Sequence, residues 1–288
     1  MKRFERWSWA FLAYLVCVIL FGAWVRISGS GDGCGNHWPL CRGEALPVAP
    51  SAKTLIEFSH RLSTGLSGIF ALVLVWWARR IGGKVFRASL AMLFFLLVEA
   101  FIGAVLVKKE LVAGDASTSR AIVVALHLCN TLLLTASAAA MAWSAGPSRP
   151  VTRPATSRSL LAAMIVLLMA TSATGAVTAL GDTLFPVGQP LLPTHHFLVR
   201  LRIVHPIVAM ITVMSVGGML LWFMQGSTLR LLRSGLHAIA GQAALGFLTI
   251  ALGAPAWMQI LHLLAAQIVW ILVFLSVLTL WNNHAAGD

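Results

Sequence analysis

Four histidines at corresponding positions are the residues of this sequence best placed to do chemistry. His60 and His205 lie in the segments EFSHRLSTGLSGI and RIVHPIVAMITVM, while His127 and His262 lie in ALHLC and ILHLL. Each sits inside an apolar stretch, where a polar imidazole is costly and usually marks function. Two imidazoles that face each other from separate helices can bind a haem iron from both sides. Zinc or copper stays open as an alternative, although no carboxylate or thiolate stands beside three of the four histidines.

A carboxylate accompanies one of these histidines. Glu57 precedes His60 by three positions and therefore shares its helix face, one turn away. The corresponding position in the other segment is Arg202, a cation. A carboxylate beside a bound substrate can move protons during a reaction. We therefore expect a reaction site around His60 and a permanent cofactor near His205, with Glu99 as a weaker candidate acid.

The segment GDGCGNHWPLC holds two cysteines, Cys34 and Cys41. Glycine and proline between them allow the chain to bend until the two side chains meet. A disulfide is the favoured interpretation if this loop lies outside the cytoplasm, where disulfides persist. A metal site that includes His37 and a pair of free thiols stay open as alternatives, although no further cysteine completes a tetrahedral zinc set.

The composition indicates the medium in which these residues act. The 288 residues are 59% hydrophobic and only 10% charged, with a mean hydropathy of +0.86. Soluble domains carry roughly 25% charged residues, so this composition excludes a soluble protein. A helix needs roughly 20 residues to cross the hydrocarbon core. The apolar stretches predict eight such spans, at 9–27, 55–78, 89–107, 121–143, 160–180, 201–224, 236–252 and 258–281.

The first span is expected to remain as a helix. It is too long for a signal peptide and has no small-residue cleavage site.

The basic residues gather on one side of the membrane. They fall in the N-terminal head and in the loops after the second, fourth and sixth spans. Because basic loops stay in the cytoplasm, we expect both termini there. The net charge of +12 then serves topology and contact with anionic lipids, and nothing in the sequence calls for nucleic acid.

The two halves of the chain resemble each other. GAWV at position 22 matches GAVT at 175, and EAFIGAVL at 99 matches QAALGFLT at 242, in addition to the histidine segments. We therefore expect an all-α integral membrane protein of two pseudo-symmetric four-helix bundles. We place the N-terminal half at 1–146, a cytoplasmic linker rich in Pro, Arg and Ser at 147–158, and the C-terminal half at 159–288.

In combination, the segments GSGDGCGNHWPLCRG, EFSHRLSTGLSG, HHFLVRLRIVHPIVA and QILHLL resemble the haem A synthase family over essentially the whole chain. These enzymes oxidise the methyl group at porphyrin position 8 of haem O, through hydroxylated intermediates, to a formyl group, and so supply haem A to terminal oxidases. The resemblance implies a haem O oxidoreductase in which His60 and His127 hold the substrate haem. Glu57 would be its catalytic acid.

The resemblance also implies a cofactor haem b whose iron is ligated by His205 and His262. It further implies that Cys34 and Cys41 form a disulfide that supports activity, and that the chain lies in the plasma membrane of a bacterial cell. The chain departs from the family between these cysteines, where the residues 35–37, GNH, stand in place of a Pro-Asp pair that many members carry.

Two other functions stay open from the sequence: a di-haem b-type electron carrier, and a haem-binding chaperone or transporter. The electron carrier would need neither Glu57 nor a cysteine pair in one half, and the chaperone would leave haem O chemically unaltered. The expected partners are haem O, a haem O synthase that supplies this apolar substrate, and membrane lipids. The sequence is compatible with a homo-oligomer.

Overall fold

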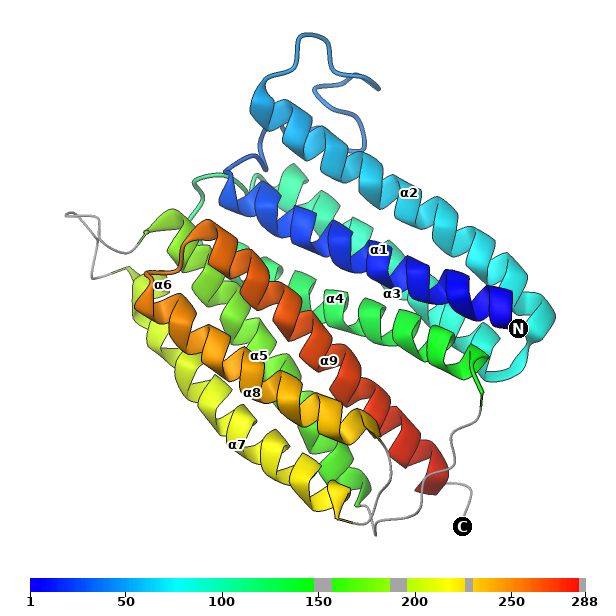
Figure 1. Cartoon of the computed structure of the whole chain (residues 1–288). Helices are drawn as coiled ribbons and strands as arrows, with labels where there is room; N and C mark the ends of the chain where they lie inside the picture. The colour runs from blue at the N-terminus through cyan, green and yellow to red at the C-terminus, as the bar shows by residue number, and fades with distance from the viewer. Residues whose placement is uncertain (148–156, 187–195, 226–229, 285–288) are drawn as a thin grey trace.

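The computed structural model describes residues 1–147, 157–186, 196–225 and 230–284, and every regular element in these ranges is a helix (Figure 1). The helices are α1 Lys2–Ile27, α2 Ala52–Ile81, α3 Gly83–Lys108, α4 Thr118–Ala145, α5 Arg158–Leu184, α6 Phe197–Arg200, η1 Leu201–Ile203, α7 Val204–Met224, α8 Arg230–Ala251 and α9 Ala256–His284. Within the described residues, eight spans are long and apolar enough to cross a membrane, and α6, η1 and α7 together form the sixth, Phe197–Met224. The prediction of an eight-span all-α membrane protein is confirmed.

The helices extend beyond the apolar stretches that predicted them. α3 begins at Gly83 rather than at 89, and α8 begins at Arg230 rather than at 236. Hydropathy marks only the part of a helix that crosses hydrocarbon, whereas the helix continues through the interface, where basic side chains reach water. The predicted linker at 147–158 lies mostly outside the described residues.

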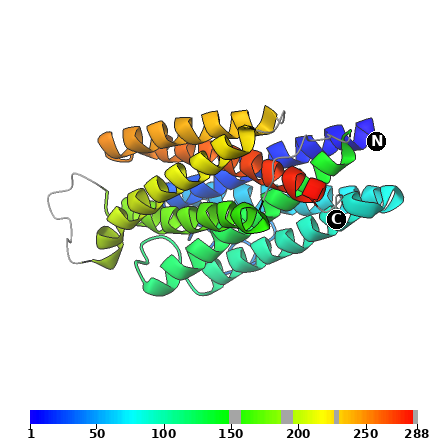
Figure 2. The ribbon, with the colours of Figure 1, turned by 90° about the horizontal axis from the view of Figure 1, so that it is seen from below.

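The four spans of each half pack in a closed ring. In the first half α1 and α3 each contact both α2 and α4, and in the second half α5 and α8 each contact both α7 and α9. The halves meet where α1 and α4 pack against α5 and α9. Figures 1 and 2 show that the start of α1 and the end of α9 lie at the same end of the bundle.

The junction between α4 and α9 is the centre of the bundle. α4 presents small buried side chains, Ala138, Ala139 and Ala142, which allow helices to approach closely. The indole of Trp270 in α9 donates a buried hydrogen bond of 2.8 Å to the carbonyl oxygen of Leu132 in α4. Because no water is present in the membrane interior to take the place of either partner, this bond fastens the two halves together.

Replacing Trp270 by Phe should lower the thermal stability of the purified protein in detergent. The change removes a buried hydrogen bond between the halves, at a cost of about 1 kcal/mol. Trp222→Phe is the control, because that side chain of α7 is 62% exposed. Equal melting temperatures for the two variants would contradict the proposed role of the Trp270 bond.

Candidate functional site

The four histidines lie on four different spans at one end of the bundle. His60, His127, His205 and His262 belong to α2, α4, α7 and α9, and each lies within the first three turns of its span. All four side chains are half-buried. Since these four spans all enter the membrane from the same side, the histidines share a similar depth.

The pair in the second half has the spacing of two axial ligands. The ring centroids of His205 and His262 are 6.3 Å apart, and the ring planes are inclined by 89°. A metal ion bound to one nitrogen of each ring at roughly 2 Å needs about this separation between the ring centres. The amide nitrogen of Gln242 lies 3.1 Å from His262 Nε2, and Thr174 Oγ1 lies 3.3 Å from His205 Nδ1. Polar neighbours therefore reach both rings.

The pair in the first half has a carboxylate as its neighbour. Glu99 Oε1 of α3 lies 3.4 Å from His127 Nδ1. Asn130 and Thr131 of α4 donate hydrogen bonds to the same carboxylate, the Asn130 bond being 2.6 Å long. Glu99 thus bonds across helices and stands beside a histidine. His60 Nδ1 is buried and has no hydrogen-bond partner among the described residues, which suits an imidazole that ligates an added group.

Glycines of neighbouring helices make room for the histidine rings. A Cβ atom added at Gly22 would lie 3.1 Å from His60 Cε1. One added at Gly175 would lie 3.0 Å from His205 Cε1, and one added at Gly246 would lie 3.3 Å from His262 Cε1. Gly22 and Gly175 also match in the sequence repeat, so the repeat held a signal for these contacts. A side chain at these positions would displace the ring that faces it.

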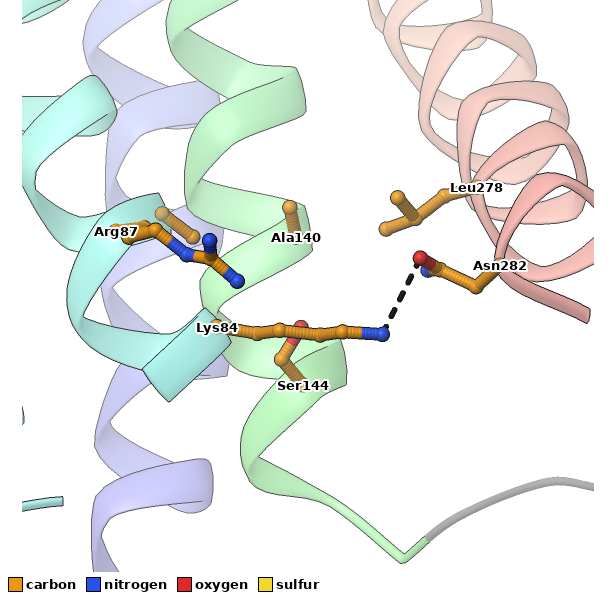
Figure 3. A pocket seen from close by; sticks show the side chains of 7 residues that line it. Lys84, Arg87, Ala140, Ser144, Leu278 and Asn282 are labelled. Atoms are coloured by element: carbon orange, nitrogen blue, oxygen red, sulfur yellow. Dashed lines mark hydrogen bonds between the residues drawn. The ribbon is translucent and has the colours of Figure 1, made fainter. Parts of the chain in front are cut away.

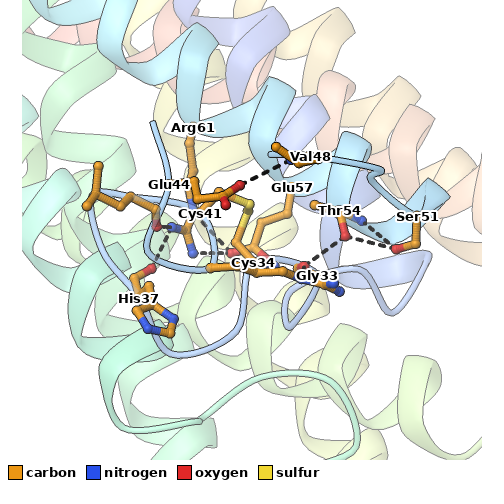
Figure 4. Close-up of a disulfide and its surroundings, with 12 residues drawn as sticks. Gly33, Cys34, His37, Cys41, Glu44, Val48, Ser51, Thr54, Glu57 and Arg61 are labelled. Atoms are coloured by element: carbon orange, nitrogen blue, oxygen red, sulfur yellow. Dashed lines mark hydrogen bonds and ion pairs between the residues drawn. A yellow bond between two sulfur atoms is a disulfide. The ribbon is translucent and has the colours of Figure 1, made fainter. Parts of the chain in front are cut away.

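The cysteine pair forms a disulfide above the start of α2 (Figure 4). Cys34 and Cys41 are joined, which confirms the predicted pairing, and the alternatives of free thiols or a metal site are wrong. Arg61 of α2 donates hydrogen bonds of 2.7 and 2.8 Å to the carbonyl oxygens of His37 and Leu40. The disulfide loop is therefore held against the helix that carries His60.

Glu57 is the point where this loop meets the histidine site. This residue is 3% exposed, and its Oε2 accepts a hydrogen bond of 2.8 Å from the backbone N–H of Cys34. Arg61 Nε donates a 3.1 Å hydrogen bond to the other oxygen. A carboxylate buried in this way needs a cation and hydrogen-bond donors, and both are present. Sequence reasoning identified Glu57 but not the backbone donor from the loop.

The second half has an ion pair that sequence reasoning missed. Arg202 Nε lies 2.7 Å from Asp182 Oδ1, and Arg202 also donates to the Gly181 carbonyl at 3.1 Å. The sequence repeat aligns Glu57 with Arg202, but Asp182 lies on a different helix, α5. The repeat therefore does not reveal the Arg202–Asp182 ion pair. The two halves therefore differ in where the carboxylate stands, rather than in whether one is present.

A further cation, half-buried, links the two halves at the end of the bundle that holds the histidines. Arg26, at the end of α1, donates hydrogen bonds to the Ala179 carbonyl and the Thr183 hydroxyl of α5, and to Gln259 of α9 at 3.3 Å. The sequence places Arg26 at a membrane boundary but gives no sign of these partners.

The donor sets favour haem iron over other metals. Among the described residues, no group of three or more His, Cys, Asp or Glu side chains is arranged to hold a metal ion. The donor sets present are imidazole pairs on facing spans, which fit the two axial positions of a haem iron. The glycines beside the rings and the orphaned nitrogen of His60 agree with this assignment.

Comparison with known proteins places the chain among cytochrome oxidase assembly proteins. The family model COX15-CtaA, described as "Cytochrome oxidase assembly protein", matches residues 5–274. A "Heme A synthase" of Exiguobacterium sibiricum is 33% identical over 69% of this chain and 68% of that protein. A "Protoheme IX farnesyltransferase" of Thermus thermophilus is 45% identical over 96% of this chain but only 48% of that protein. The chain thus spans about half the length of the Thermus relative.

The family match covers both histidine pairs, the disulfide loop and Glu57. The chain belongs to the COX15-CtaA family of cytochrome oxidase assembly proteins.

Proposed function

We propose that this protein is a haem A synthase, an oxidoreductase that converts the C8 methyl group of haem O to a formyl group. One observation carries the proposal: a membrane bundle holds two histidine pairs, and a buried carboxylate stands one turn from a histidine of the first pair. The family match and the relatives named "Heme A synthase" support it. With water as the source of the formyl oxygen, the overall conversion is CH3 + H2O → CHO + 4 H+ + 4 e−, and an external acceptor takes the electrons. The site must therefore handle both electrons and protons.

In this proposal the first half binds the substrate. His60 and His127 hold the iron of haem O, and Glu99 orients the His127 ring through its contact with Nδ1. Glu57 lies one turn from His60, between the Arg61 guanidinium and the Cys34 N–H. Its role is to move protons at the edge of the porphyrin, while the loop above it limits access of water.

The second half holds the resident cofactor, haem b, between His205 and His262. A haem bound there supplies the one-electron chemistry that side chains lack. Thr174 and Gln242 fix the orientation of the two rings. Because Gly175 has no side chain, the His205 ring can lie directly against it.

The expected location and partners follow from the same assignment. We infer that the disulfide loop faces the outside of a bacterial plasma membrane and that both termini are cytoplasmic, because the basic loops lie at the end of the bundle with the termini. A haem O synthase is the proposed partner. The Thermus relative named as a farnesyltransferase supports this, since about half of its length resembles this chain.

Co-expression with a haem O synthase, in a host that makes no haem A, tests the function. Chromatography of the extracted haems should reveal haem A or its hydroxylated precursor. A haem-loaded protein that leaves only haem B and unmodified haem O would favour the electron carrier or the chaperone.

Replacing Glu57 by Gln should reduce haem A formation roughly 100-fold or more while haem stays bound. The amide keeps the shape of the side chain and can still accept the Cys34 N–H, but it cannot take up a proton. Haem content by absorbance separates this loss from misfolding. Glu110→Gln, in the exposed loop after α3, is the matched control. Full activity of Glu57→Gln would remove this residue from the mechanism.

Replacing Gly175 by Ala should lower the content of haem b and change its absorbance spectrum, because the added methyl group would lie 3.0 Å from the His205 ring. Displacing one axial ligand is expected to weaken binding roughly 10- to 100-fold. His262→Ala should give the same loss. Gly241→Ala is the control, since no atom lies within 4 Å of the place that its added methyl group would take. Unaltered haem b in both site variants would mean that the roles of the halves are reversed.

A further inference from the structure

A basic pocket lies far from the histidines, at the end of the bundle where α1 starts and α9 ends (Figure 3). It has a volume of about 230 Å³ and lies between α3 and α4 of the first half and α9 of the second. Its polar lining consists of Lys84, Arg87, Ser144 and Asn282, and its apolar lining includes Ala140 and Leu278. No part of the proposed haem chemistry uses it.

The polar groups of this pocket are those that bind phosphate. Lys84 Nζ lies 3.3 Å from Asn282 Oδ1 across the pocket, and Figure 3 shows Arg87 directed toward the same space. Arg87 makes no hydrogen bond or ion pair with the part of the chain that the structure describes. Arginine and lysine together with a serine hydroxyl and an amide N–H are donors for phosphate oxygens.

The surroundings add positive potential to the pocket. Lys84 stands in the first turn of α3 and Arg87 at the start of the second; α3 is a 26-residue helix whose N-cap, Gly82, offers no side-chain acceptor. The helix dipole therefore adds to the two charges. No carboxylate is among the described residues that line the pocket. Within the described residues of this end, Glu5 is the one carboxylate, and its side chain lies against Gly146.

Each of the three helices places a small or apolar residue one turn deeper than its polar residue. Lys84 is followed by Ala88 on α3, Ser144 is preceded by Ala140 on α4, and Asn282 is preceded by Leu278 on α9. The polar groups thus form a rim at the membrane interface, and the apolar groups form a floor toward the hydrocarbon. A free phosphate ion gains nothing from apolar residues below the rim. A phospholipid can place its headgroup among the polar groups of the rim and an acyl chain against the apolar floor.

We propose that this pocket binds the phosphate headgroup of an anionic phospholipid, with Lys84 and Arg87 as its charged ligands. Basic pockets between membrane helices are suited to such headgroups. The bound lipid contacts α3 and α9 and so bridges the two halves at the end opposite to the histidines.

The test is native mass spectrometry of the full chain in mild detergent, with phosphatidylglycerol, phosphatidylcholine or inorganic phosphate added. The wild type should retain phosphatidylglycerol in preference to phosphatidylcholine. Lys84→Gln with Arg87→Gln should reduce this retention roughly 10-fold or more, since each cation near an anionic lipid contributes to its affinity. Arg79→Gln with Arg233→Gln removes the same charge from exposed positions at this end and should have little effect.

Ala140→Phe provides a second arm that leaves every charge in place. Its ring would fill the pocket, so lipid retention should fall as it does in the double charge variant. If the double charge variant does not fold, Ala140→Phe tests the proposal in its place. Three results would overturn the proposal: equal retention of the two lipids, an equal loss in the Arg79 and Arg233 control, or displacement of the lipid by inorganic phosphate. The last result would identify a free phosphate as the occupant.

Discussion

The structure depends on one constraint: a polar side chain within a membrane span must find its partner inside the protein. An unpaired polar group in hydrocarbon costs several kcal/mol, because no water is present to bond it. Arg26, Arg202 and Glu57 all meet this constraint with partners from other parts of the chain. The histidines meet it only in part. His60 Nδ1 lacks a partner among the described residues, which is compatible with the proposed role of this histidine in binding haem.

The same constraint explains why the disulfide loop and the first histidine site form one unit. Glu57 is buried beside His60 and needs donors, and the loop provides one through the N–H of Cys34. The disulfide holds this stretch of loop in a short closed turn, and Arg61 bonds both the loop and the carboxylate. The position of the Glu57 carboxylate is thus set partly by a segment that lies outside the spans. The second half has an arginine–aspartate pair instead, whose cation comes from η1 and whose carboxylate comes from α5.

Much of this arrangement could be predicted from the sequence, since hydropathy and internal repetition are properties of single segments. The eight spans, the histidine pairs, the disulfide and Glu57 all came from such patterns. The contacts of Asp182 and Arg26 could not be predicted, because they join helices whose relative rotation the pattern does not report. The short α6 and η1 before α7 were missed for a similar reason: apolar composition does not reveal a change of helix type. The facing glycines were within reach, since Gly22 and Gly175 align in the repeat.

The junction between the halves links the two proposed haem sites. If the substrate lies in the first half and the cofactor in the second, electrons must cross where α1 and α4 pack against α5 and α9. Hydrogen bonds fasten this junction along its length: Arg26 near the histidines, Trp270 in the middle and the Trp143 indole, 3.1 Å from Thr279, toward the other end. Close packing between these bonds keeps the separation of the sites constant, which a hinge would not. The two halves are alike in sequence, but neither could complete the proposed oxidation without this rigid contact.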